Sequence, residues 1–314
     1  MKSKILWGSI FVLIATLMLM GCSLTGREDD MRPPPGSQRR VALVIGNANY
    51  THASRLKNPV NDALDVSEIL RDLKFDKVFE YSDASKAEIQ AGVKKFAEQL
   101  KKDDIAFFFF SGHGLQLNRK NYLVPVEARI NTDETDIQKL QTDIETQTIA
   151  AEEIVDAMAK AKVSVVALDA CRNKLLPAGS GKKGLNATDS LVKGLASMPL
   201  ERDTSKVGNG EIVVLYATKD GTPAYETNGR NSLFTKHLLI NLKEKDLPVN
   251  QLLVKVGDAV REESVQEYGE AQVPYWYGST QKICLAAPNC GTVSRGSNNK
   301  GGEGGGPPPP PPPI

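Results

Sequence analysis

Three short runs of the chain, residues 41–46, 105–110 and 163–168, are almost continuously apolar and rich in β-branched or aromatic side chains. Runs of this length and composition are typical of strands buried on both faces of a parallel sheet. Helical patterns separate the runs, and strands that alternate with helices favour a parallel sheet with helices on both faces. The sequence therefore predicts a single α/β domain, with a mostly parallel sheet, over residues 39–290.

Further elements complete this pattern. Asn58 places a capping residue before Pro59, which predicts a helix that begins there and continues to about residue 73. A polar stretch with a hairpin around residues 118–121 follows the second apolar run. The other predicted elements are strands at residues 77–81 and 211–217 and helices near residues 86–100, 151–160, 232–242 and 249–263.

Two reactive side chains stand just past predicted strands. His113 follows the second apolar run between Gly112 and Gly114, and Cys171 follows the third. Reactive groups of parallel sheets gather outside the carboxyl ends of the strands. The two glycines leave room for a substrate backbone beside the imidazole. The sequence thus predicts a Cys–His site at this edge of the sheet.

The alternatives for Cys171 are weaker. A buried structural thiol is common in proteins, but Cys171 lies between the polar residues Asp169 and Arg172. No C-x-x-C or H-x-x-x-H spacing exists, so the sequence predicts no metal site of the zinc type. His52 lies in a polar loop and His237 in an amphipathic helix, where ordinary roles suffice.

Other common chemistries are excluded or disfavoured. Residues 179–184 fit G-x-G-x-x-G, but no strand leads into them and no helix follows, so a mobile loop is the better interpretation. No P-loop is present, because Leu185 stands where the lysine is required. There is no G-x-S-x-G for a serine hydrolase. The net charge of +1 gives no reason to expect a nucleic-acid partner.

The two ends of the chain differ from its centre. Residues 1–22 have a basic start, an apolar stretch and a small residue before Cys22, which predicts a secretory signal peptide. Residues 23–38 are polar and proline-containing, as in a flexible tether. Residues 291–314 are rich in Gly, Ser and Asn and end in seven prolines before Ile314. This composition predicts a disordered tail, and a polyproline II ligand for an envelope protein is the alternative.

The ending of the signal segment resembles the bacterial lipobox, in which the cysteine becomes the lipidated first residue. We therefore expect Cys22 to anchor the domain to a membrane of the bacterial cell envelope, outside the cytoplasm. Ser23 resembles a signal for the outer membrane if the host is Gram-negative. An uncleaved membrane anchor is the alternative, since the apolar stretch is long enough to span a bilayer. For an exported chain we also predict a disulfide between Cys284 and Cys290, with free thiols as the alternative.

Across roughly residues 40–285, the chain resembles the caspase–metacaspase family of cysteine peptidases. The matching motifs are Phe110-Ser111-Gly112-His113-Gly114 and Asp169-Ala170-Cys171-Arg172, with the histidine 58 positions before the cysteine. The segments 44–50, 61–63, 217–218 and 229–235 also match. The resemblance implies a caspase-like fold and acyl transfer, in which Cys171 attacks the scissile carbonyl and His113 protonates the leaving amine. It also implies an oxyanion site made by the backbone N–H groups of Gly114 and Cys171.

The residue two positions before the cysteine indicates which substrates are cleaved. Animal caspases have glutamine there and select aspartate, whereas this chain has Asp169, as metacaspases do. The resemblance implies that Asp169, Asp62 and Ser111 line a pocket for Arg or Lys, and a carboxylate pairs best with such cations. Pro59 departs from the metacaspase pattern, which has cysteine there. The other interpretation of Asp62 is a favourable charge in the first turns of a helix.

The resemblance leaves some properties open. Many metacaspases need calcium, but no loop has the spacing of Ca²⁺ ligands. A non-catalytic caspase-like scaffold that binds envelope proteins is an alternative function, as is an arginine- or asparagine-specific peptidase of a neighbouring family. The segment between the strands ending at Leu168 and starting near Glu211 is polar and contains Lys and Gly. It predicts self-cleavage after Lys182, Lys183 or Arg202.

Overall fold

The chain alternates strands and helices throughout the part that the computed structural model describes: residues 38–118, 120–131, 134–171, 210–219, 224–278 and 283–286, with Cys171 described by its backbone alone. The strands are β1 (Arg40–Gly46), β2 (Lys77–Ser82), β3 (Ile105–Leu117), β4 (Lys120–Leu123), β5 (Ile149–Ala150), β6 (Val163–Cys171), β7 (Glu211–Tyr216) and β8 (Tyr275–Gly278). The helices are α1 (Pro59–Asp72), α2 (Lys86–Gln99), α3 (Ile137–Gln147), α4 (Ala151–Ala157), α5 (Leu233–Leu242) and α6 (Val249–Tyr268).

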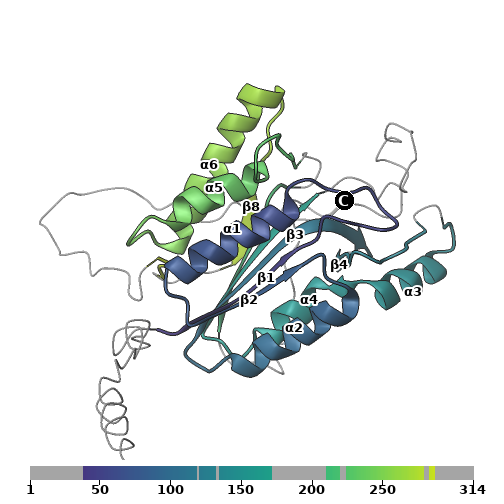
Figure 1. Cartoon of the computed structure of the whole chain (residues 1–314), viewed down its shortest axis with the longest axis horizontal. Helices are drawn as coiled ribbons and strands as arrows, with labels where there is room; N and C mark the ends of the chain where they lie inside the picture. The colour runs from purple at the N-terminus through teal and green to yellow at the C-terminus, as the bar shows by residue number, and fades with distance from the viewer. Residues whose placement is uncertain are drawn as a thin grey trace, which may run out of the picture. The chain divides into compact units, whose positions relative to one another are not determined.

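The strands form one sheet in the order β2-β1-β3-β6-β7-β8 (Figure 1). The first five of these are parallel to one another, and β8 is antiparallel to β7. The far end of β3 turns back into β4 as a hairpin, and β4 also pairs with β5. The predicted α/β class and mostly parallel sheet are confirmed, with β8 as an antiparallel edge strand.

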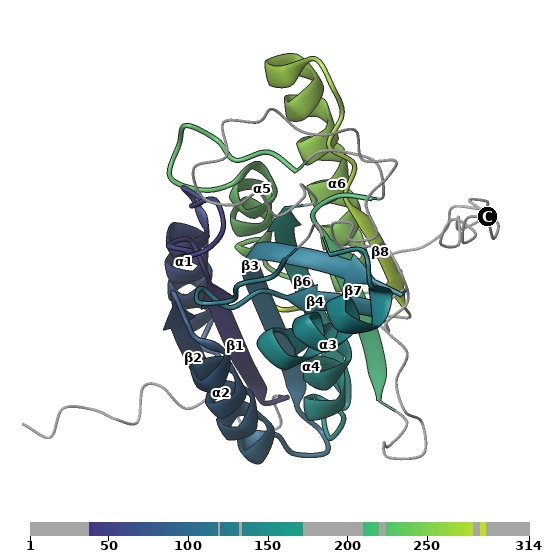
Figure 2. The ribbon, with the colours of Figure 1, turned by 90° about the vertical axis from the view of Figure 1, so that its right-hand side faces the viewer.

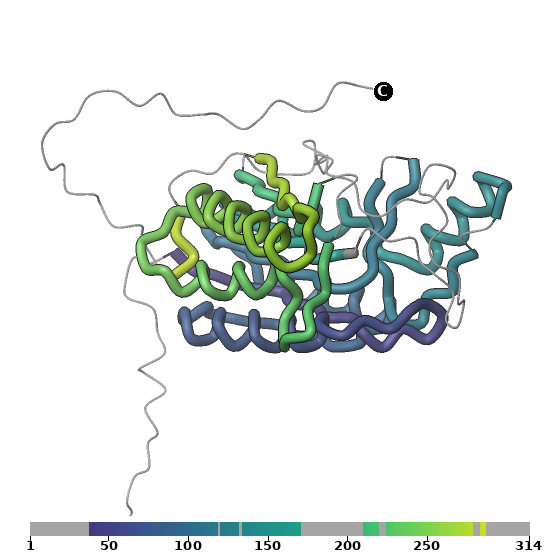
Figure 3. The backbone as a smooth tube through the Cα atoms, turned by 90° about the horizontal axis from the view of Figure 1, so that it is seen from above, coloured from purple at the N-terminus to yellow at the C-terminus, as the bar shows by residue number. Residues whose placement is uncertain are grey.

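Alternation along β3 explains why helices cover both faces. Successive side chains of a strand point to opposite faces. Phe107 and Phe109 belong to the buried cluster that includes α1, α5 and α6, whereas Phe108 and Phe110 belong to the cluster that includes α2 and α4. Figures 1 and 2 show these two helical layers on opposite sides of the strands, and Figure 3 shows α5 and α6 side by side. Each fully buried aromatic or aliphatic side chain contributes on the order of 2 kcal/mol.

Some elements differ from the sequence predictions. β3 and β6 continue past their apolar runs, so His113 and Cys171 lie within paired strands and not beyond them. The helix α3 was not predicted, because only Leu140 and Ile144 of its residues are buried. These two side chains pack in a small separate cluster with residues of the β3–β4 hairpin. A helix with so few core contacts leaves only a weak periodic signal.

Several predicted features lie outside the described residues. These are the signal segment with Cys22, the tether up to residue 37, the tail, Cys290 and the predicted self-cleavage sites. Cys284 is disulfide-bonded, and its pairing with Cys290 stays a prediction. Among the described helices, none combines the length and apolar character needed to cross a membrane.

A buried arginine at the start of β1 fastens three parts of the domain together. Arg40 is 2% exposed, and its guanidinium donates hydrogen bonds to Leu285 O (2.7 Å), Leu73 O (2.9 Å) and Lys74 O (3.1 Å). The guanidinium also lies 5.0 Å from the centroid of the Phe75 ring. Burial lowers the pKa of Arg40, and the charge of Asp76 opposes this shift. The planar fork of arginine can donate to the carbonyls of residues 73, 74 and 285 at the same time, which a single ammonium is less suited to do.

We therefore expect Arg40→Lys to lower the free energy of unfolding by about 2 to 4 kcal/mol, because buried carbonyls lose their donors. Urea denaturation measures this change. Arg71→Lys is the control, because Arg71 forms an exposed ion pair with Glu80 and its replacement should change stability by less than about 0.5 kcal/mol. Equal losses in the two variants would contradict the role given to Arg40.

Candidate active site

The register between β3 and β6 brings the predicted catalytic residues together. Nine residues of each strand are paired in parallel, from Ile105 opposite Val163 to His113 opposite Cys171. The same ladder sets Ser111 opposite Asp169. On the other side of β3, Gly46 of β1 is paired with Ser111. The carboxyl ends of three parallel strands therefore meet at the predicted site.

The imidazole of His113 is buried and held by a backbone carbonyl. Its side chain is 5% exposed, and Nε2 lies 2.7 Å from Ser54 O. A carbonyl can only accept a hydrogen bond, so Nε2 carries the proton and Nδ1 of the neutral ring is left as an acceptor. Nδ1 is buried without a hydrogen-bond partner among the described residues. Burial lowers the pKa of His113, although the Ser54 carbonyl and the charge of Glu226 oppose this shift.

Tyr50 holds the backbone of His113 in place. The Tyr50 hydroxyl accepts a hydrogen bond from His113 N (2.7 Å) and donates to Val124 O (3.2 Å), and its ring lies 4.4 Å from the imidazole. A Cβ on Gly112 would lie 2.6 Å from that hydroxyl. The glycine at position 112 therefore makes room for Tyr50, and it also lines the pocket that contains Asp62 and Asp169.

Next to the His113–Cys171 pair, two buried aspartates come from different elements. Asp62 of α1 is 0% exposed and Asp169 of β6 is 7% exposed. Asp62 accepts hydrogen bonds from the Ser111 hydroxyl (3.0 Å) and from Ser232 N (3.0 Å). Asp169 accepts from the hydroxyls of Ser232 and Thr235, the latter at 2.6 Å. Neither carboxylate forms an ion pair within the described part of the chain.

The surroundings of this aspartate pair favour its protonated form. Burial raises the pKa of Asp62 well above its ordinary value, and the nearby charge of Asp169 raises it further. Burial also raises the pKa of Asp169, while its hydrogen bonds to Ser232 and Thr235 limit the increase. A cation that entered between the two carboxylates would stabilise their charged forms.

A loop after β7 forms one side of the pocket that contains Asp62 and Asp169. Glu226 accepts hydrogen bonds from Lys57 N (2.5 Å) and Asn58 N (3.3 Å). The Asn58 side chain accepts from Thr227 N (3.0 Å) and donates to Gly229 O (3.0 Å). Asn58 occupies the predicted N-cap position before Pro59, but its side chain makes no capping bond to α1. The buried amide ties the loop to the start of the helix instead.

The pocket contains every predicted substrate-binding residue. It is lined by Leu56, Asn58, Pro59, Asp62, Ser111, Gly112, Asp169, Ala224, Tyr225, Glu226 and Ser232. Pro59 is accommodated as a wall because Gly46 has no side chain: a Cβ there would lie 2.1 Å from Pro59 O.

The described residues contain no cluster of side chains typical of a metal site. No group of three or more His, Cys, Asp or Glu side chains among them could hold a metal ion. Asp62 and Asp169 already accept hydrogen bonds from hydroxyl and N–H donors. Hard cations such as Ca²⁺ need about six to eight oxygen ligands.

Several residues of the site were not predicted from the sequence. Ser54 acts through its backbone carbonyl, which no side-chain pattern can reveal. Glu226 lies in a loop without a motif. Ser232 and Thr235 belong to the segment 229–235 that carried part of the family resemblance, and their spacing at the start of a helix was the available signal. Gly114 lies in β3 one residue beyond His113, opposite Leu123 of β4.

Comparisons with known proteins point to one family. The family model described as Caspase domain matches residues 39–284. The human mucosa-associated lymphoid tissue lymphoma translocation protein 1 is 28% identical over 229 residues, which cover 71% of this chain and 24% of that protein; its mouse homolog matches to the same extent. The chain thus spans about a quarter of the length of these curated relatives. The crystal structure of caspase-1 from Spodoptera frugiperda has a TM-score of 0.48 at 14% identity, covering 77% of this chain and 86% of that one.

The buried aspartates lead to a prediction about stability. A carboxyl group whose pKa is raised by folding binds its proton more tightly in the folded state, so its contribution to stability falls as pH rises above 3.8. An asparagine in place of Asp62 would stay neutral and could keep the bonds to Ser232 and Ser111. Asp62→Asn should therefore raise the free energy of unfolding at pH 8 by about 1 to 3 kcal/mol, with a smaller gain at pH 5.

Urea denaturation at the two pH values measures this difference. Asp65→Asn on the same helix is the matched control. Asp65 lies 2.7 Å from Arg230 in an ion pair, so this variant should be less stable than the wild type at pH 8. If the Asp62→Asn variant is less stable than the wild type at both pH values, burial of the Asp62 charge does not lower the free energy of unfolding.

Proposed function

The chain belongs to the caspase-domain family of cysteine peptidases, and on this basis we propose that it is an endopeptidase that cleaves proteins after Arg or Lys. Cys171 is the nucleophile and His113 is the acid–base. The observation that carries the proposal is the placement of a neutral, oriented imidazole beside Cys171, next to a pocket with two buried carboxylates.

The geometry supports a two-step acyl transfer. Nδ1 of His113 takes the thiol proton of Cys171, and the thiolate adds to the scissile carbonyl carbon. His113 then gives this proton to the nitrogen of the leaving amine as the C–N bond breaks, which leaves a thioester. Water, deprotonated by His113, hydrolyses the thioester and releases the acid and the free thiol. Throughout, Ser54 O keeps the proton on Nε2 and so keeps Nδ1 directed to the reaction.

Two backbone groups are proposed to stabilise the oxyanion. The N–H groups of Gly114 and Cys171 lie at the ends of the paired segments that hold His113. Donors that are fixed before the reaction can stabilise the developing negative charge without reorganisation.

Charge complementarity supports specificity for basic residues. Asp62 and Asp169 line the pocket with Glu226 close by, and no Lys or Arg is among the described lining residues. A guanidinium or ammonium would neutralise a buried cluster of like charges, whereas an aspartate side chain would add to the repulsion. The charge of the pocket therefore suits Arg or Lys before the scissile bond, and its free volume of about 10 Å³ requires the lining residues to move apart to admit that side chain.

For the location of the enzyme we propose lipid anchoring at Cys22 in a bacterial envelope. This proposal is supported by the sequence of residues 1–22 alone.

Loss of either catalytic residue should abolish activity. Cys171→Ala and His113→Ala should reduce kcat for an Arg-containing fluorogenic peptide by a factor on the order of a million. Circular dichroism checks that both variants fold. His237→Gln is the control, because His237 pairs with Glu263 on α6 and is not among the residues that line the pocket. A Cys171→Ala enzyme within tenfold of the wild type would refute the assignment.

The pocket that contains Asp62 and Asp169, called the carboxylate pocket from here on, should select the residue before the scissile bond. Peptides with Arg or Lys there should be cleaved, and matched peptides with Asp should not. Asp169→Asn should lower kcat/KM for the Arg peptide by about thirtyfold or more, the scale of an unpaired buried charge. Because the pKa values of Asp62 and Asp169 are raised, KM for the Arg peptide should increase as the pH falls. Equal turnover of Arg and Asp peptides would exclude the pocket.

A further inference from the structure

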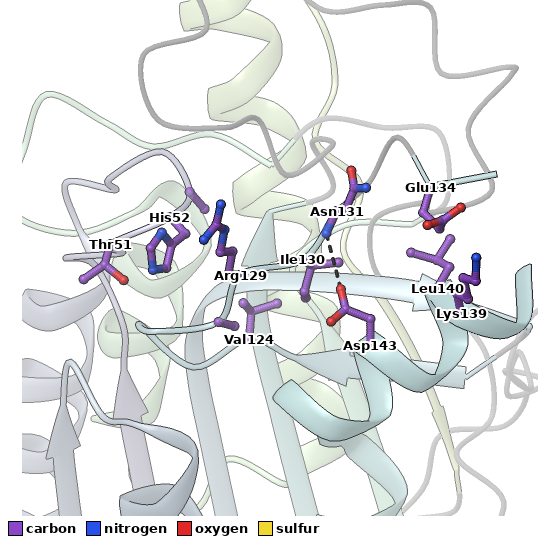
Figure 4. Close-up of a pocket in the computed structure, with 12 residues that line it drawn as sticks. Thr51, His52, Val124, Arg129, Ile130, Asn131, Glu134, Lys139, Leu140 and Asp143 are labelled. Atoms are coloured by element: carbon purple, nitrogen blue, oxygen red, sulfur yellow. Dashed lines mark hydrogen bonds between the residues drawn. The ribbon is translucent and has the colours of Figure 1, made fainter. Parts of the chain in front are cut away.

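A second pocket lies near His113, between the segment after β1 and the start of α3. It has a volume of about 780 Å³. Thr51 and His52 form one wall, Arg129 and Asn131 form another, and Glu134 and Asp143 lie toward α3 (Figure 4). None of these side chains takes part in the chemistry described above.

One segment relates the two pockets to the catalytic histidine. Residues 51–53 line the second pocket, Ser54 O contacts Nε2 of His113, and Leu56, Asn58 and Pro59 line the carboxylate pocket. The two pockets therefore lie on either side of His113 along this segment. Val124 gives a second link, since it lines the second pocket and its N–H donates to His113 O at 3.1 Å.

The position of the second pocket relative to His113 indicates which part of a substrate it would contact. This inference rests on the proposed function. The side chain before the scissile bond occupies the carboxylate pocket. The amine that leaves must be within reach of His113, which protonates it. The peptide beyond that amine then continues past His113 to the other side. We propose that the second pocket binds the residues that follow the scissile bond, and that it prefers an acidic side chain among them.

The preference for acidic residues follows from which charges in the pocket are already paired. Glu134 accepts hydrogen bonds from the backbone of Thr135 and Asp136, each at 2.9 Å. Asp143 accepts from Asn131 N at 3.4 Å and from the Gln147 side chain. These bonds hold both carboxylates in place, and Lys139, the other cation of the lining, lies 3.8 Å from the carboxylate of Asp136.

Arg129, in contrast to the two carboxylates, is unpaired among the described residues. Its guanidinium has no hydrogen bond or ion pair with any residue in the described part of the chain. Its backbone, however, is fixed on both sides by Gln147, which accepts from Arg129 N (2.8 Å) and donates to Arg129 O (2.9 Å). Figure 4 shows Arg129 at the same end of the pocket as Thr51 and His52, the residues that lead to Ser54. An exposed, unpaired guanidinium on a fixed backbone, in the pocket that residues 51–53 also line, is suited to bind a carboxylate.

Quenched fluorescent peptides test this proposal. All carry Arg before the scissile bond, and the first three residues after it are varied one at a time among Asp, Asn and Lys. For the wild type, kcat/KM with Asp should exceed that with Asn by about threefold to tenfold at one of these positions, the scale of a partly exposed ion pair. Added salt should reduce the ratio.

Variants of Arg129 test the residue that we assign. Arg129→Gln should bring the Asp-to-Asn ratio to within twofold of one, and Arg129→Glu should reverse the preference toward Lys. Arg71→Gln is the matched control, because this exposed arginine of α1 lines neither pocket and should keep the wild-type ratio. An unchanged ratio in Arg129→Gln would overturn the assignment.

Cleavage of a peptide with a coumarin amide directly after Arg tests the proposed function independently of the second pocket. This peptide has no residue after the scissile bond that could occupy that pocket. If the wild type cleaves it but shows no preference among the longer peptides, the second pocket has no such role and the peptidase assignment stands. If neither kind of peptide is cleaved, the proposed function itself fails.

Discussion

The parallel pairing of β3 with β6 is the constraint on which the site depends. It sets Ser111 opposite Asp169 and His113 opposite Cys171 within one continuous ladder. A slip of one residue would set Asp169 opposite Gly112 and separate the histidine from the cysteine. The buried phenylalanines of β3 prevent such a slip, because Phe107 and Phe109 fill one core while Phe108 and Phe110 fill the other. The packing that makes the sheet stable therefore also fixes the register of the proposed catalytic pair.

The segment after β1 adds precision to this register. Asn47 bonds to Ala84 through both its amide oxygen and its amide nitrogen, and Asp83 accepts from the backbone of Ala48 and Asn49. These contacts hold the chain that carries Tyr50 and Ser54 to His113. Polar side chains in this segment thus act as the supporting shell that orients the imidazole, a role that apolar contacts alone would not fill.

The aspartates show the opposite balance, because burying two carboxyl groups close together costs stability. Asp62 and Asp169 are buried close together, and their partners are hydroxyl and N–H groups and not cations in the described residues. An arginine or lysine of the protein would stabilise them but would also occupy the pocket. The hydroxyl donors orient the carboxyl groups without neutralising them, which is compatible with the proposed binding of a basic side chain. Such a site is preorganised and strained electrostatically, which is common where binding must discriminate by charge.

The sequence by itself determined the α/β class, the order of the strands and helices other than α3, β5 and β8, and the motifs that contain His113, Cys171, Asp62, Ser111 and Asp169, because periodic burial and short motifs are local properties of the chain. It could not determine the Ser54 carbonyl, the Tyr50 hydroxyl, the approach of Glu226 or the tie between Asn58 and the loop that closes the pocket. It placed Asn58 at the start of α1, where the structure also finds it, but the side chain of Asn58 bonds to the loop after β7 and not to the helix. These features join segments up to 171 residues apart, as between Asn58 and Gly229. Only the tertiary structure decided these features, because contacts between distant segments form only after the sheet has brought the strand ends to one edge.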